Sequence, residues 1–291
     1  MFATLLGALP RPTDGPDDVE EVVGLAVRTQ LDAGLEPITD GRLRAAPLDQ
    51  LPSAEVAVEW WRSTAATTDR AVKQALPGPF GPAGAALADE LAEVATALAE
   101  AGCPLVEIEE RSVERLADDE QRRRFRQLHE RLLERVSGTH MSLSIVGHAP
   151  PQAAWATVLE LPYASLAVDL IDGPDSWNLV TRWPGDRGVI AGAESARKLD
   201  EPKEVLLWAA HYAASTQGRG LDRVGLGSAG SYANLTWEAA VRKMQLLGEA
   251  ARLASMPPSA ELAASLDPRG VSSRAAALGT TARPARKPPG R

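Results

Sequence analysis

A histidine on a short apolar run is the first residue of this chain that could do chemistry. The run THMSLSIV, residues 139–146, has the composition of a strand and carries His140, Ser142 and Ser144 at alternate positions. A second run, PLVEIE at 104–109, carries Glu107 and Glu109 at the same spacing. Because side chains alternate between the two faces of a strand, each set shares one face. A histidine and several carboxylates around one space could move protons or hold a hard metal ion.

The elements that would position these residues follow a regular order along the chain. Strands are expected at 3–8, 35–39, 73–77, 104–109, 139–146, 164–171, 187–191 and 222–227. Helices are expected at 17–33, 84–100, 117–136, 201–216 and 235–254, the last with Asn234 as its N-cap. Eight strands that alternate with helices predict an α/β protein with a parallel sheet closed into a (β/α)8 TIM barrel. A doubly wound open sheet is the alternative, but the first strand runs into LPRP and not into a glycine-rich phosphate loop.

Barrel enzymes carry their active sites at the C-terminal ends of the strands. This rule selects four catalytic candidates, which are His140, Glu109, Glu110 and Asp169. It selects as substrate-binding candidates Arg11, Asp40, Arg42, Arg111, Ser142 and Ser228, and it also brings Glu107, Glu194 and Ser231 to the same end. Each candidate has a structural alternative, since the carboxylates could pair with Arg111 or Arg11 and His140 could be a hydrogen-bonded core residue.

The remaining histidines and the cysteine are expected to be structural. His129 lies in a highly charged helical pattern and is expected on the surface, His148 in a loop, and His211 in the packing of an Ala- and Trp-rich helix. Cys103 is expected to be a small buried residue at the start of its strand.

Composition limits the class of protein. The chain has 291 residues, 44% of them apolar, and a net charge of −8, which argues against a basic nucleic-acid-binding surface. No apolar stretch approaches the length of a membrane span and no signal peptide is recognisable, so a cytoplasmic protein is expected. Residues 1–255 are predicted to form one barrel, and 256–291 a mostly disordered tail rich in Pro, Ala and Arg.

Several segments carry a family resemblance through their order and spacing. They are LLGALPRP (5–12), QLDAGLEPITDGRLR (30–44), LPGPF (76–80), AGCPLVEIEE (101–110), THMSLS (139–144), GVIAGAES (188–195), EPKEV (201–205) and GLGSAG (225–230). Together they resemble the C-terminal catalytic barrel of cobalamin-independent methionine synthase, in the superfamily that also holds uroporphyrinogen decarboxylase. The resemblance implies a barrel to about residue 254.

The resemblance also implies a zinc site, which is degenerate in this chain. Members of the family hold zinc with a His-x-Cys pair, a Glu and a second Cys, and the metal activates a thiol that attacks the methyl group of a reduced folate. Here His140 is retained, Ser142 and Ala229 stand at the two cysteines, and Asp169 stands near the glutamate. Serine is a poor zinc ligand and alanine is none, so no tightly bound zinc or other cofactor is expected. A reduced folate remains compatible as a ligand.

Further departures from the family suggest altered chemistry. An Asp-Glu-Pro motif of the family is Glu109-Glu110-Arg111 here, Arg42 stands at an acidic position, and Ala191 replaces an aspartate. Three functions stay open: a transferase or lyase acting on a small polar or folate-like substrate without a thiolate zinc site; a methyltransferase using methylfolate with a different acceptor or a weakly bound metal; and a non-catalytic ligand-binding relative. The arginines favour an anionic small-molecule partner. A homodimer is left open.

Overall fold

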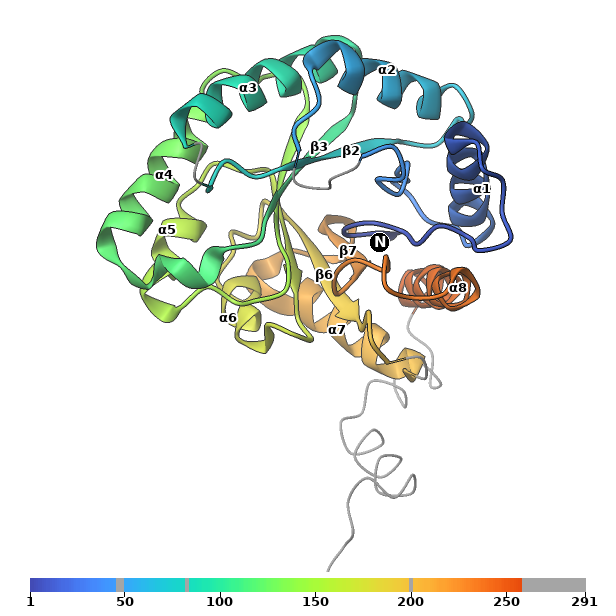
Figure 1. The fold of residues 1–291 in the computed structure, drawn as a ribbon. Coiled ribbons are helices and arrows are strands. Elements are labelled where there is room, and N and C mark those ends of the chain that lie inside the picture. Colours follow the sequence, from blue (N-terminus) through green and yellow to red (C-terminus); the bar gives the residue numbers. More distant parts are fainter. Residues whose placement is uncertain (46–49, 82–83, 199–200, 258–291) are drawn as a thin grey trace, which may run out of the picture.

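Seven parallel strands form one sheet in the computed structural model, which describes residues 1–45, 50–81, 84–198 and 201–257. The spatial order is β1-β7-β6-β5-β4-β3-β2, and Figure 1 shows the sheet curling inside an arc of helices. The strands are β1 (Phe2–Thr4), β2 (Lys73–Pro77), β3 (Leu105–Glu110), β4 (His140–Ile145), β5 (Ser165–Asp169), β6 (Gly188–Glu194) and β7 (Val224–Ser228). The α/β class with a parallel sheet is therefore confirmed. Residues 258–291, most of the predicted tail, lie outside the described residues.

The segment 35–39 was expected as a strand and forms only a single bridge. The Glu36 N–H donates to the Ala3 carbonyl (2.8 Å), beside β1, and Ile38 pairs with Val72, just before β2. Pro37, which follows a cis peptide bond, has no N–H to donate, so a regular ladder cannot run through this segment. In the described residues the sheet thus has seven strands and not the predicted eight, and its two edges are connected through this irregular segment.

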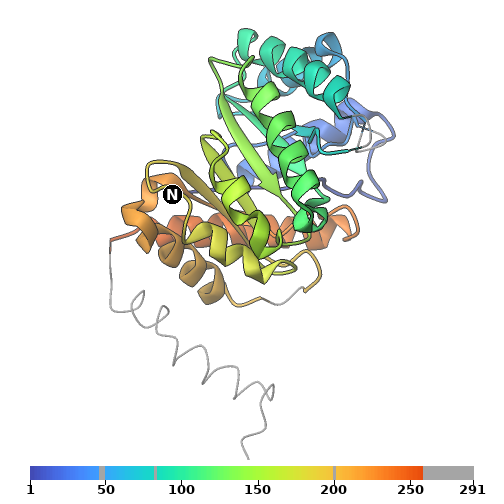
Figure 2. The same cartoon turned by 90° about the vertical axis from the view of Figure 1, so that its left-hand side faces the viewer.

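Eight α-helices pack around the outside of the described sheet (Figures 1 and 2). They are α1 (Val19–Asp32), α2 (Ala54–Ala65), α3 (Ala85–Glu100), α4 (Asp119–Leu133), α5 (Trp155–Leu159), α6 (Trp177–Val180), α7 (Lys203–Ser215) and α8 (Trp237–Ala254). The five predicted helices are present, while α2, α5 and α6 were not predicted. Helix α8 is capped by Thr236, whose side chain accepts from the Ala239 N–H, and not by the predicted Asn234. No helix among the described residues is long and apolar enough to cross a bilayer.

The two faces of the sheet differ in polarity. Side chains such as Ile108 and Leu143 point outward and join the main apolar core beneath the helices. The opposite, inner face contains a small separate apolar cluster of Leu6, Ala167 and Ile190. Strand alternation therefore directs Glu107 and Ser142, which are paired in register between β3 and β4, to the inner face.

Candidate functional site

Glu109, near the end of β3, lies between two guanidinium groups. Its Oε2 is 2.6 Å from Nη1 of Arg42, and its Oε1 accepts from Nε of Arg111 at 2.6 Å. Glu109 and Arg42 are buried, whereas the Arg111 side chain is 45% exposed. We call these three residues the arginine–glutamate cluster. The cluster has a formal charge of +1, and its accessible cation is Arg111.

The loop after residue 39 holds Arg42 in an unusual conformation. Gly41 and Arg42 both have positive φ angles, 67° and 55°, and the Arg42 N–H donates to Oδ1 of Asp40 at 2.8 Å. A non-glycine residue in this region costs on the order of 1 kcal/mol or more, so surrounding contacts must stabilise it. Burial raises the pKa of Asp40, an effect opposed by the Arg42 N–H and by the charge of Arg44. The predicted binding residues Asp40 and Arg42 therefore act together, with Asp40 holding the backbone and Arg42 reaching Glu109.

A second buried ion pair lies on the inner face, two residues earlier on β3. Nζ of Lys73 is 2.7 Å from Oε2 of Glu107 and donates to the Leu5 carbonyl at 2.6 Å. Burial raises the pKa of Glu107, and the nearby ammonium opposes that rise. Within the described residues, Oε1 of Glu107 and the hydroxyls of Ser142 and Ser144 have no hydrogen-bond partner. Lys73 was not among the predicted site residues, and the carboxylates of Glu107 and Glu109 do pair with cations, the structural alternative foreseen for them.

His140 lies at the opposite end of the sheet from the arginine–glutamate cluster. It is the first residue of β4, it is exposed, and its Nε2 shares a hydrogen bond with Oγ of Ser165 (2.8 Å), the first residue of β5. Five residue steps along β4 correspond to about 17 Å. The prediction that His140 faces the C-terminal ends of the strands is therefore wrong: the strand begins at His140, and Ser144 is the inward residue nearest its end.

Glu110 faces the helices and not the inner space. Its Oε1 accepts from the Phe80 N–H at 3.0 Å and lies 3.1 Å from Nε2 of His129 in α4. His129 is fully buried, and its Nδ1 shares a hydrogen bond with the Tyr163 hydroxyl at 2.7 Å. The prediction of a catalytic Glu110 facing the inner space is wrong, because neighbouring strand residues point to opposite faces and Glu110 follows the inward Glu109. The prediction that His129 lies on the surface is also wrong, because His129 is buried beside Glu110. The Glu110 carboxyl also lies against Gly78, where an added Cβ would approach Oε1 to 2.2 Å.

Asp169 ends β5 where expected, but its carboxylate is occupied by the backbone. It accepts hydrogen bonds from three N–H groups, those of Gly147 (3.2 Å), Ile171 (2.8 Å) and Asp172 (2.8 Å). Burial raises the pKa of Asp169, and these donors oppose the rise. Asp169 thus fixes the loops after β4 and β5, and any reaction through it would first have to break these bonds.

Two other predicted binding residues also contact the backbone. Oγ of Ser228 donates to the Leu6 carbonyl (3.0 Å) and accepts from the Leu6 N–H (2.9 Å), which ties β7 to the loop after β1. Arg11 is exposed, and its Nη2 donates to the Leu43 carbonyl at 3.2 Å. Arg11 therefore joins the loop that carries Arg42, whereas Ser228 is used structurally.

Glu194, at the end of β6, faces helix α8 and not the inner space. The Tyr232 hydroxyl donates to its Oε2, and Nζ of Lys243 lies 3.7 Å from its Oε1 and 3.7 Å from Oε2 of Glu201. Burial raises the pKa of Glu194 to about 8. Glu194 was expected beside the other carboxylates of the inner space. It points to the helices because the register shift between Gly192 and Glu194 adds one residue to β6, which reverses the alternation of side chains between the two faces.

The chain does not present a zinc site of the family type in its described part. No group of three or more His, Cys, Asp or Glu residues there could hold a metal ion. His140 and Asp169 lie at opposite ends of the sheet, and Ala229 offers no ligand atom. Cys103 is buried as predicted, and burial raises the pKa of its thiol to about 11. The weak or absent binding of zinc stays a prediction.

Comparison with known proteins identifies the fold. No family model and no curated protein matches the chain. A B12-independent methionine synthase from a Shewanella species, solved with selenomethionine, superposes with a TM-score of 0.72 at 14% identity over 86% of this chain and 96% of its own. A putative vitamin-B12-independent methionine synthase from Listeria monocytogenes gives 0.67 at 15% identity over 88% and 98%. A dihydrodipicolinate synthase from Aquifex aeolicus gives 0.54 at 11% identity over 96% and 82%.

These neighbours define the class of the protein as an α/β chain with a curled parallel sheet of TIM-barrel type. More particularly, its fold is similar to that of B12-independent methionine synthases, so the resemblance read from the sequence is confirmed at the level of the fold. At 14–15% identity the likeness shows the fold alone.

Proposed function

We propose that this chain is an enzyme of the transferase or lyase type that acts on a small anionic molecule at the C-terminal ends of the strands. The observation that carries the proposal is the arginine–glutamate cluster, in which the guanidinium of Arg111 is accessible and Arg42 is held behind it. Arginine presents several N–H donors in a fixed plane that matches a carboxylate or a phosphate. The similarity in fold to barrel enzymes supports a catalytic role at this end of the sheet.

The cluster suggests how binding could prepare the site for chemistry. An anion that binds Arg111 competes with Oε1 of Glu109 for the same N–H groups. Oε1 would then be available to accept a proton from the bound molecule, while Arg42 keeps Oε2 in place. A reduced folate belongs to the same ligand class through its glutamate carboxylates, and methyl transfer from methylfolate to a different acceptor is one reaction of this type.

A non-catalytic ligand-binding protein is the second candidate, and one observation favours it. Three carboxylates on strands β3 and β5 already have partners: Glu109 has two arginines, Glu107 has Lys73, and Asp169 has three backbone N–H groups. A protein that only binds its ligand needs no carboxylate to change partner.

One titration tests the anion site, and Arg111→Gln is the informative variant. The purified chain is titrated by NMR with small carboxylates, phosphate monoesters and 5-methyltetrahydrofolate. Loss of a charge-assisted hydrogen bond should weaken the binding of the best anion by about 10- to 100-fold. Arg135→Gln is the matched control, because the Arg135 side chain is also 45% exposed but lies in the turn after α4, where it pairs with Asp89 of α3. Equal loss in both variants, or no loss in either, would contradict the proposed site.

The same samples separate the two functions. An enzyme should consume one of the bound anions and release a new compound, and Glu109→Gln should slow that conversion by about 10²- to 10⁴-fold. Binding of the anion without conversion, in the presence of candidate second substrates, would support the ligand-binding protein.

A further inference from the structure

A hollow opens at the N-terminal end of the sheet, opposite the arginine–glutamate cluster. It is lined by the first residue of each of five strands, which are Phe2, Leu105, His140, Ser165 and Gly188. Ala71 and Arg223, which precede the other two strands, β2 and β7, also line this hollow. We call this space the N-terminal hollow. It contains His140, which the proposed function does not use.

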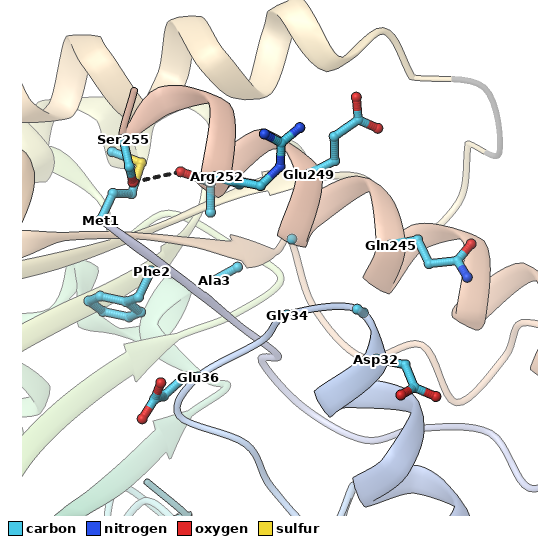
Figure 3. A pocket seen from close by; sticks show the side chains of 13 residues that line it. Met1, Phe2, Ala3, Asp32, Gly34, Glu36, Gln245, Glu249, Arg252 and Ser255 are labelled. Atoms are coloured by element: carbon cyan, nitrogen blue, oxygen red, sulfur yellow. Dashed lines mark hydrogen bonds between the residues drawn. The ribbon is translucent and has the colours of Figure 1, made fainter. Parts of the chain in front are cut away.

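The wall of the N-terminal hollow is mostly apolar. Phe2 and Leu105 are partly exposed into it, and Ala164 and Gly188 leave room beside them. Figure 3 draws a neighbouring groove along α8, which includes Glu249 and Arg252. In the same view, the side chains of Phe2 and Ala3 project from opposite sides of β1. The aromatic ring of Phe2 thus offers a surface on which a flat apolar group can pack.

A single polar pair stands in this apolar wall. Nε2 of His140 and Oγ of Ser165 are 2.8 Å apart, and Ser165 is only 4% exposed. Nδ1 of His140 has no hydrogen-bond partner among the described residues. Partial desolvation of the imidazole lowers the pKa of His140, so the ring is neutral near pH 7. In the tautomer in which Nε2–H donates to Oγ of Ser165, Nδ1 carries no proton, and the hollow offers it as a hydrogen-bond acceptor for a ligand.

The rim of the hollow carries balanced charge. Asp186 stands beside Arg187, and Asp222 beside Arg223. Arg187 is partly committed, since its Nη1 donates to the Leu161 carbonyl at 2.7 Å. Two acids and two bases leave no net charge that would select an anion or a cation.

We propose that the N-terminal hollow binds an uncharged, flat ring compound that carries one N–H or O–H group. The ring packs against Phe2 and Leu105, and its polar group bonds to Nδ1 of His140. This site is independent of the proposed function, because it lies at the other end of the sheet.

Indole is the probe, since it is flat, uncharged and has one N–H; 1-methylindole has the same ring without the donor. The full chain, labelled with ¹³C in its histidines and in its leucine methyl groups, is titrated with each compound by NMR, and the affinity is measured from the His140 signals and from the methyl signals of Leu105. Indole should shift both sets of signals. 1-Methylindole should bind about fivefold more weakly, because one hydrogen bond of about 1 kcal/mol is lost.

Two variants and one control complete the test. His140→Ala should weaken indole binding by about fivefold while the fold is kept, because His140 is exposed and bonds only to Ser165. Ala164→Phe should fill the hollow and abolish binding, and His148→Ala, an exposed histidine elsewhere, should change nothing. Absence of binding up to the solubility limit, equal affinity for both probes, or unchanged binding in His140→Ala would each overturn the proposal.

Discussion

Glu194 is a buried carboxyl whose surroundings make the stability of the fold depend on pH. Burial is the largest cause of its raised pKa of about 8, opposed by the Tyr232 hydroxyl and by the charge of Lys243, while the charge of Glu201 adds to the rise. The unfolded chain releases this proton near pH 4.5, whereas the folded chain keeps it to about pH 8. The stabilising contribution is therefore complete below pH 4.5 and is lost as the pH rises towards 8.

Glu194→Gln should remove this pH dependence. The amide resembles the protonated acid and can still accept from Tyr232, so the variant should lose less stability than the natural chain between pH 5 and 8. The difference in slope is at most about 1.4 kcal/mol per pH unit. Denaturant unfolding at a series of pH values measures it.

Glu249→Gln is the control for this experiment. Glu249 is partly exposed and pairs with Lys203 at 3.0 Å, so its removal should leave the slope unchanged. Parallel pH profiles for the natural chain and Glu194→Gln would show that Glu194 is already ionised in the folded protein.

At the residue scale, the sequence predicts which residues share a strand but not the end or the face that each one occupies. The alternate spacing correctly places Glu107 and Glu109 on one face, where both meet cations. His140 was assigned to the wrong end although the predicted strand, 139–146, begins within one residue of β4, so that assignment did not follow from the place of His140 on its strand. Lys73 was missed because its role depends on contacts with Leu5 and Glu107, which are distant in sequence.

Helix α8 packs against the end of α1 so closely that one glycine is required. A Cβ added at Gly248 would lie 1.6 Å from the Ala33 carbonyl oxygen, which is backbone and cannot move aside. Gly248→Ala should therefore destabilise the fold by about 1–3 kcal/mol, despite the better helix propensity of alanine. Thermal or denaturant unfolding measures the loss.

Gly24, in α1, provides the opposite result as a control. A Cβ there would meet only the end of the flexible Arg28 side chain, at 3.4 Å. Gly24→Ala should stabilise the fold by about 0.5–1 kcal/mol, because alanine costs less backbone entropy in a helix. Similar effects of both substitutions would mean that α1 and α8 are not in close contact.

At the element scale, periodicity and caps predict the long helices well. Asp18 and Asp118 cap α1 and α4 within a residue or two of the predicted starts. The segment 35–39 has the composition of a strand, but Pro37 interrupts its ladder, and Ala54–Ala65 was left unassigned although Ser53 caps it. Hydrogen bonds to both sheet edges determine the conformation of 35–39, and a single sequence does not contain that information.

At the scale of the whole molecule, the sheet offers chemically different surfaces at its two ends. The C-terminal end presents the charged arginine–glutamate cluster, and the N-terminal end presents the apolar hollow with its His140–Ser165 pair. The side chains of Glu107 and Lys73 are buried between them. We therefore expect a charged anion to bind at the C-terminal end and an uncharged ring such as indole at the N-terminal end, so the two can be titrated independently on one chain.

The described fold ends with α8, which leads to the prediction for residues 258–291. These residues contain six basic and two acidic side chains, while the whole chain has a net charge of −8, so any contact they make with the rest of the chain would be partly electrostatic. Since all described strands and helices end by Ala254, a chain truncated after Pro257 should unfold within about 2 °C of the full chain. Truncation after Leu246 is the control, because it removes the buried residues Leu247, Ala250 and Ala254 and should lower the melting temperature by many degrees. A large fall after the first truncation would mean that 258–291 packs on the fold, and loss of that effect in about 0.5 M salt would identify the contact as electrostatic.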